Sequence, residues 1–99
     1  MPTYVYIGRD SARGVELRKV HREAHLARLD ELEVAGRIRY GGPLRDADSQ
    51  PCGSVVIFEA DDLDAARAWA EADPYLAEGI FESLEVFETA AIFPKNRAG

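Results

Sequence analysis

The residues best suited to chemistry lie between Arg22 and Leu32, where a histidine interrupts a run of leucines at helical spacing. Side chains three and four residues apart share one face of a helix. One such face carries Arg22, His25, Leu29 and Leu32, with Leu26 beside it. This row is ionisable at its N-terminal end and apolar at its C-terminal end, as in a helix that packs on a sheet and borders a pocket. A lone histidine on an apolar face is also common as a plain core residue, so both interpretations stand at this point.

A second candidate is the tripeptide Asp73-Pro74-Tyr75, which follows a predicted helix. It offers a carboxylate, a rigid peptide and a phenol that can close a pocket and donate a hydrogen bond. Because the residue before a proline disfavours helical geometry, a simple helix-ending turn is the alternative interpretation.

A histidine paired with an aspartate can move protons without metal or organic cofactor. Imidazole takes up and returns protons near neutral pH, while a hydrogen-bonded carboxylate fixes its tautomer and stabilises the imidazolium. Such a pair would therefore suit proton abstraction, elimination or isomerisation of a small substrate. No nucleophile is needed for these reactions.

Other potential ligands and nucleophiles are sparse. The histidines and carboxylates lack the clustered spacing of zinc ligands, so we expect no metal and no cofactor. His21 lies four residues before His25, and the two could share a metal only if the helix began earlier than predicted; otherwise His21 is solvated or caps the helix. Cys52 is the only cysteine, so it forms no disulfide within the chain, and no histidine near it in sequence makes it a nucleophile.

Composition limits the classes of partner. A chain of 99 residues, 46% hydrophobic and 30% charged, predicts a single globular domain over residues 1–99. Its net charge of -6 disfavours nucleic acid, and no apolar run is long enough for a membrane span. We expect a cytoplasmic protein whose partners are a small-molecule substrate and a second copy of itself.

The order of predicted elements is strand, helix, strand, strand, helix, strand. The predicted strands cover residues 3–8, 37–40, 53–59 and 80–88, and the predicted helices cover about 20–35 and 61–72. Residues 9–19 are predicted as a loop, 41–43 as a break in regular structure and 44–51 as a second loop. Residues 94–99 are predicted as a flexible tail. Gly36 ends the first helix. This order is typical of the ferredoxin-like α+β fold, a four-stranded antiparallel sheet with two helices on one face.

The composition of two of the predicted strands indicates that the chain forms a dimer. Residues 3–8 and 53–59 are apolar on both faces, whereas two helices can cover only one face of the sheet. We therefore expect a homodimer packed sheet to sheet, a dimeric α/β sandwich or barrel.

An ordered set of motifs resembles the YciI-like (YCII-related) family over nearly the whole chain. The set is Arg22-x-x-His25-Leu26-x-x-Leu29, Gly36, Gly42-Pro43, Gly53-Ser54, and Asp73-Pro74-Tyr75 before Gly79. The resemblance implies a ferredoxin-like dimer with a pocket centred on His25 and Asp73. It also implies that the pocket is lined or supported by Arg22, Gly42, Pro43, Ser54 and Tyr75. The family includes a lyase-type activity on a chlorinated aromatic ring-breakdown compound, and fold alone does not transfer such an activity.

Three interpretations of function remain open, the third being a purely structural interaction domain. The first is a small cofactor-independent enzyme, of lyase or isomerase type, in which His25 and Asp73 transfer a proton. The alternative is a non-catalytic dimeric module that binds a small molecule, an anion held by His25 and Arg22.

Overall fold

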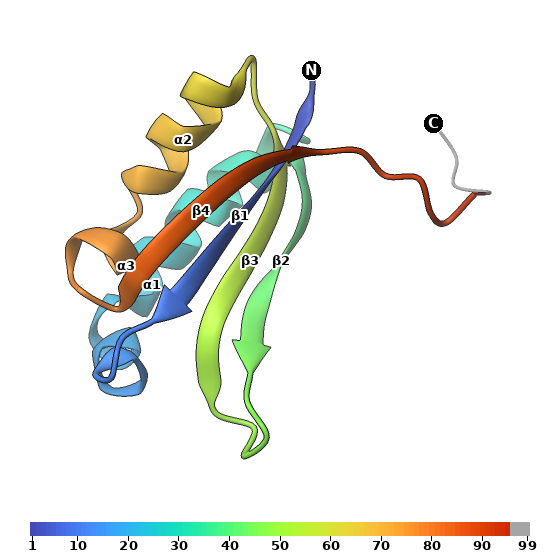
Figure 1. The fold of residues 1–99 in the computed structure, drawn as a ribbon. Helices are drawn as coiled ribbons and strands as arrows, with labels where there is room; N and C mark the ends of the chain where they lie inside the picture. The colour runs from blue at the N-terminus through green and yellow to red at the C-terminus, as the bar shows by residue number, and fades with distance from the viewer. Residues whose placement is uncertain (96–99) are drawn as a thin grey trace.

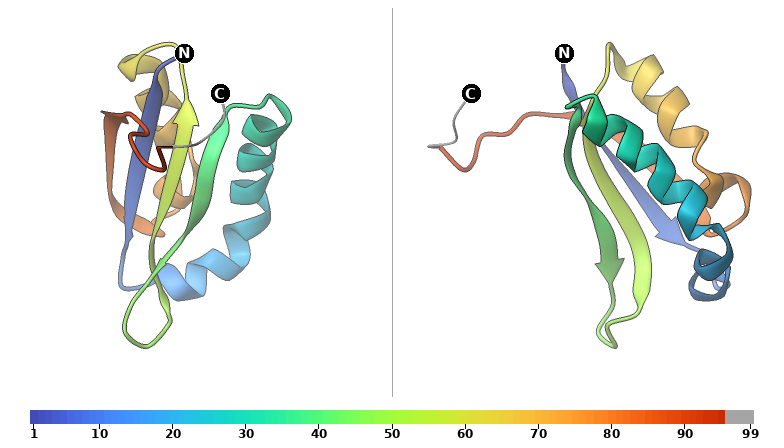
Figure 2. Two further views of the ribbon diagram at one scale, coloured as in Figure 1. Left: turned by 90° about the vertical axis from the view of Figure 1, so that its right-hand side faces the viewer. Right: turned by 180° about the vertical axis from the view of Figure 1, so that it is seen from behind.

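A computed structural model describes residues 1–95 of the chain (Figure 1). Its elements are β1 (Thr3–Asp10), α1 (Gly14–Val34), β2 (Ile38–Arg45), β3 (Pro51–Glu59), α2 (Leu63–Glu71), α3 (Pro74–Ala77) and β4 (Phe81–Thr89). The strands form one antiparallel sheet in the order β2-β3-β1-β4. The helices lie on one face, and the segment after β4 leaves on the other side (Figure 2). This is the ferredoxin-like fold that the sequence predicts; residues 96–99 of the predicted tail lie outside the described range.

The core lies between the central strands and the helices. Side chains alternate between the faces of a strand, so Tyr4 and Tyr6 on β1 point inward beside Phe58 and Val56 on β3, their partners in register. All four are at most 2% exposed. No helix of the described residues is long and apolar enough to cross a membrane.

Helix α1 begins earlier than the sequence predicts. The interpretation of residues 9–19 as a loop is wrong, because β1 continues to Asp10 and the helix starts at Gly14. Arg18 donates two hydrogen bonds of 2.8 Å to Asp10, and this contact holds the first turns of the helix against the end of β1. At its other end α1 stops as predicted, since Gly36 takes a φ of 71°, which glycine adopts without steric cost.

Strand β2 runs through the predicted break. Residues 41–43 continue the pairing with β3, and the predicted loop 44–51 shrinks to a turn closed by Asp46, whose side chain accepts the N–H groups of Asp48 and Gln50. Proline is tolerated here because β2 is an edge strand, where a missing N–H need not interrupt a ladder. A strand therefore forms one wall of the site.

The tripeptide Asp73-Pro74-Tyr75 follows the end of α2 and begins a further helix, α3. Asp62 caps α2, its side chain accepting the N–H of Ala65 at 2.8 Å. Asp73 then caps the one-turn helix α3, and Pro74 occupies the first helical position, where no N–H is required. This cap fixes the Asp73 carboxylate between α1 and the sheet.

Candidate functional site

The Asp73 carboxylate is completely buried and saturated with donors. Its Oδ1 accepts the backbone N–H of Tyr75 at 2.9 Å, and its Oδ2 accepts the hydroxyl of Tyr6 at 3.1 Å. Nδ1 of His25 lies 2.9 Å from both oxygens. A buried carboxylate is costly unless it is hydrogen-bonded, so these three partners explain how Asp73 is accommodated at 0% exposure.

These partners also keep Asp73 ionised. Burial raises the pKa of the carboxyl, but the hydrogen bond with His25, the N–H of Tyr75, the His25 charge and the Tyr6 hydroxyl together lower it below its usual value. Burial and the nearby Asp73 charge raise the pKa of the Tyr6 phenol strongly. Tyr6 therefore stays protonated, and its hydroxyl donates a hydrogen bond to Asp73. The carboxylate is thus a fixed anion facing His25.

Arg28 places a positive charge behind the same carboxylate. Its Nη1 lies 3.7 Å from Oδ2 of Asp73 and is buried with no hydrogen-bond partner among residues 1–95. Its Nη2 donates to the carbonyl of Trp69 at 2.6 Å, and the guanidinium stacks 4.3 Å from the centre of the Trp69 ring. Arg28 is therefore held by Trp69 at a fixed distance from Asp73.

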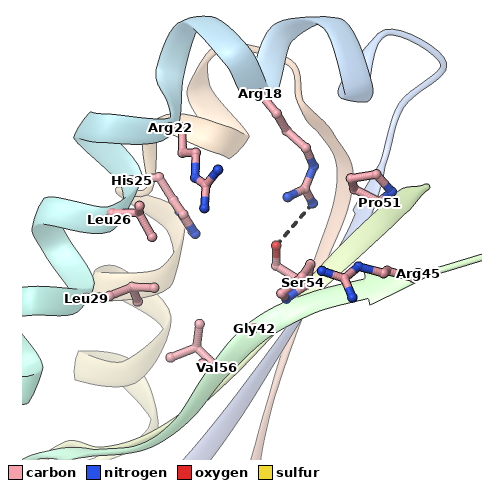
Figure 3. A pocket seen from close by; sticks show the side chains of 12 residues that line it. Arg18, Arg22, His25, Leu26, Leu29, Gly42, Arg45, Pro51, Ser54 and Val56 are labelled. Atoms are coloured by element: carbon pink, nitrogen blue, oxygen red, sulfur yellow. Dashed lines mark hydrogen bonds between the residues drawn. The ribbon is translucent and has the colours of Figure 1, made fainter. Parts of the chain in front are cut away.

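The His25 ring is clamped in one orientation. It stacks on Tyr75, with ring centres 3.9 Å apart and planes inclined by 5°. The Arg18 guanidinium also lies over the Tyr75 ring, 5.1 Å from its centre. Because Nδ1 is engaged by Asp73, Nε2 is the nitrogen left for a ligand, and the ring points into a cavity (Figure 3).

That cavity has a volume of about 390 Å³ and lies between α1, β2 and β3. Five of the predicted site residues line it: Arg22, His25, Gly42, Pro43 and Ser54. Leu26, Leu29 and Val56 add apolar surface, and Arg18 and Arg45 add charge. The volume is in the range of small-molecule sites.

Arg18 links the cavity wall to β1 and β3. Besides Asp10, its Nη2 donates to the carbonyl of Gly53 at 2.9 Å and to Oγ of Ser54 at 3.1 Å. Burial lowers the pKa of the guanidinium, but the bonds to Asp10 raise it by more, so Arg18 stays charged. Ser54 is thereby oriented toward the cavity by Arg18.

Two predicted site residues lie behind the cavity wall. Asp73 and Tyr75 contact the His25 ring but are not among the lining residues. Sequence reasoning missed Arg18, Arg28 and Tyr6. Arg18 precedes Arg22 by four residues and His25 by seven, so it lies on the same face of the helix. It was missed because the helix was predicted to begin only at about residue 20. An inward-facing tyrosine hydroxyl on a buried strand signals a polar partner, and this could have identified Tyr6.

The remaining candidates lie apart from this arrangement. Nε2 of His21 lies 4.0 Å from a carboxylate oxygen of Glu78, and Cys52 is exposed near the start of β3. Within residues 1–95, no three His, Cys, Asp or Glu side chains cluster closely enough to hold a metal ion.

Fold and site together define a ferredoxin-like α+β domain with a buried histidine–aspartate pair beside a small cavity. The chain belongs to the YCII-related domain family, whose model matches residues 2–90. It is 42% identical over 96 residues to protein YciI of Escherichia coli O6:H1, an alignment that covers 91% of this chain and 98% of that protein. An uncharacterized protein of Haemophilus influenzae is 33% identical over the same shares of both chains.

The chain is also similar in fold and sequence to a solved structure. That structure is the 5-chloro-2-hydroxyhydroquinone dehydrochlorinase TftG of Burkholderia phenoliruptrix, in complex with 2,5-dihydroxybenzoquinone. The TM-score is 0.79 and the identity 28%, over 89% of this chain and 93% of that one. A putative antibiotic biosynthesis monooxygenase of Nitrosomonas europaea, at TM-score 0.56 and 15% identity over 94% of this chain and all of that one, shares the fold alone.

Proposed function

We propose that the chain is a small cofactor-independent enzyme that transfers a proton on a small organic substrate, a reaction of lyase or isomerase type. The observation that carries the proposal is the His25–Asp73 pair: Nδ1 is held by both carboxylate oxygens at 2.9 Å, and the opposite side of the ring faces the cavity. This is the geometry of a general base whose tautomer is fixed by a carboxylate.

Each neighbour has a role in this mechanism. Nε2 of His25 takes a proton from a carbon or oxygen acid, and the adjacent Asp73 anion stabilises the imidazolium that forms. Tyr75 keeps the ring in place by stacking. The proton is then returned at another position, which is isomerisation, or a leaving group departs with its electron pair, which is elimination.

The similarity to the dehydrochlorinase supports elimination as the first reaction to test. That protein acts on a chlorinated, hydroxylated ring and was crystallised with a dihydroxylated quinone. Removal of HCl from such a ring needs a base and departure of chloride, and it needs no redox partner. A cavity of about 390 Å³ accommodates one ring of this size.

The test uses chlorinated and non-chlorinated hydroquinones and small keto acids in D₂O. Chloride release and the exchange of carbon-bound protons for deuterium are followed, the exchange by proton NMR. We expect the wild-type chain to accelerate one of these reactions and His25→Asn to slow it about 10²- to 10⁴-fold. His21→Asn, one turn earlier on α1, should leave the rate unchanged. If the wild-type chain is no faster than buffer on every substrate, the proposal fails and the non-catalytic binding module replaces it.

A further inference from the structure

The ionisable side chains that line the cavity are opposite in sign to the net charge of the chain. The net charge of the protein is -6, yet every ionisable residue that lines this cavity is basic: Arg18, Arg22, His25 and Arg45. No aspartate or glutamate among residues 1–95 is part of the lining. Arginines that line one cavity of an otherwise acidic protein favour the entry of anions into that cavity.

Arg18 has one amino group free for a ligand. Its Nε and Nη2 are engaged by Asp10, Gly53 and Ser54, whereas its Nη1 has no hydrogen-bond partner within the described range 1–95. Figure 3 shows this guanidinium and that of Arg22 turned toward the same space. Arg22 forms no ion pair with any described residue and is exposed. Two guanidinium groups that share a space are suited to charge-assisted hydrogen bonds with an anionic oxygen.

The far end of the cavity is apolar. Leu29 and Val56 face each other there, with Leu26 next to them, and His25 lies between this end and the arginines (Figure 3). A flat hydrocarbon body matches this end better than a hydrated, flexible chain.

We propose that the substrate class of this site is a small planar organic oxyanion, with its anionic oxygen on Arg18 and Arg22 and its carbon body between Leu29 and Val56. This inference rests on the proposed function for the reacting position, which is the carbon facing His25. When a C–H bond on a saturated carbon next to the conjugated body breaks, its proton forms an N–H bond on Nε2, and the electron pair moves through that body to the oxygen. The arginines then stabilise charge where it increases in the transition state.

Binding is tested by calorimetry with two matched pairs of probes. Benzoate is compared with benzamide, and 2,5-dihydroxybenzoquinone, ionised at neutral pH, with neutral hydroquinone. We expect at least one anion to bind about tenfold or more tightly than its neutral partner, with affinity that falls as salt is added. The pair that responds distinguishes a carboxylate from a ring-bound oxygen.

Variants assign the effect to the cavity. Arg22→Met should weaken binding of the anion about five- to tenfold, because a charge-assisted hydrogen bond is lost at an exposed side chain. Arg67→Met, which removes the same charge from the exposed face of α2, should change nothing. Anions that bind no better than their neutral partners, anions that do not bind at all, or an Arg22→Met variant with unchanged affinity would each overturn the inference.

The two proposals fail separately. Tight anion binding without any His25-dependent reaction would reject the proposed function and retain the anion site. A His25-dependent reaction in a chain that shows no preference for anions would reject the anion site and retain the proposed function.

Discussion

Asp73 performs two structural tasks with one carboxylate. Its Oδ1 caps α3 through the N–H of Tyr75, and both of its oxygens face Nδ1 of His25. The residue that orients the proposed base is thus held by the start of a helix and not by a flexible loop. Replacing Asp73 therefore affects the stability of the chain as well as its chemistry, and the two effects have to be measured apart.

The first prediction concerns pH and Asp73→Asn. The pKa of Asp73 lies below its ordinary value of 3.8 in the folded state, so the ionised carboxylate stabilises the fold above that value. This contribution is lost as the pH falls through the folded pKa. We expect the free energy of unfolding to decline between about pH 5 and pH 2 more steeply for the wild type than for Asp73→Asn. Urea titrations across this range that give parallel curves would contradict the prediction.

The second prediction separates two tyrosines on one strand. Tyr6→Phe removes a buried hydrogen bond to an ionised group and should cost about 1.5 to 3 kcal/mol at neutral pH. Tyr4→Phe is the matched control, because Tyr4 also points inward and is 2% exposed, but its hydroxyl has no side-chain partner among residues 1–95. Urea unfolding of both variants measures the difference. Equal losses would show that the Tyr6–Asp73 bond contributes nothing specific.

At the scale of elements, local pattern predicted most of the fold. Short runs of β-branched and aromatic residues located β1 and β3, and Gly36 located the end of α1. The start of α1 was missed because residues 9–19 are polar and contain Ser11 and Gly14, which suggested a loop; the contact of Arg18 with Asp10, eight residues earlier, is not visible in the helical period. The strand through residues 41–43 was missed because its position at the sheet edge, which tolerates Pro43, is a property of the whole sheet.

The candidate site was likewise predicted where a local pattern indicated it and missed where it depends on contacts between elements. His25 was identified by its place on a leucine-lined face, whereas its partner Asp73 is 48 residues away in sequence and was proposed through the family resemblance. Arg28 was missed because its neighbours on the helix give no sign that Trp69 on another helix would hold it beside Asp73. Residue types can suggest a reaction, but the contacts that tune it lie between elements.

The third prediction tests the packing of α2 on the sheet. Trp69 lies 4.9 Å from the Phe58 ring and 6.1 Å from the Tyr6 ring, centre to centre. Trp69→Ala should therefore cost about 3 to 5 kcal/mol, the usual loss when a large packed aromatic is removed. Val34→Ala, at a position that is 89% exposed, should change the free energy of unfolding by less than about 0.5 kcal/mol. A small effect at Trp69 in urea would mean that α2 is loosely packed.

At the scale of the whole molecule, the sheet face without helices needs a cover. Val5, Ile7, Val55 and Ile57 point to this face, where Tyr40 and Phe87 are 54% and 50% exposed. The segment after β4 leaves on the side of this face and, with Tyr40 and Ile57, borders an open pocket of about 620 Å³. Apolar surface of this kind is typical of an interface, and a two-fold dimer lets one patch cover itself.

The fourth prediction is therefore a homodimer formed through this face. Light scattering at micromolar concentration should give twice the mass of one chain. Ile57→Glu should shift the mass to that of the monomer, because it places a charge in the centre of the apolar face. Glu31→Lys, on the exposed side of α1, is the control and should remain dimeric. A wild-type chain with the mass of one copy would contradict the prediction.

Trp69 is the only tryptophan in the chain, and its indole lies against the guanidinium that faces the Asp73 carboxylate. Indole emission responds to charge and polarity within a few ångströms, so the protein carries an intrinsic optical probe of its own charge network. We expect a change of protonation or of ligand at His25 to alter the field at Arg28 and, with it, the wavelength and intensity of the emission. The proposed proton transfer can therefore be followed in a stopped-flow fluorimeter on the unlabelled chain.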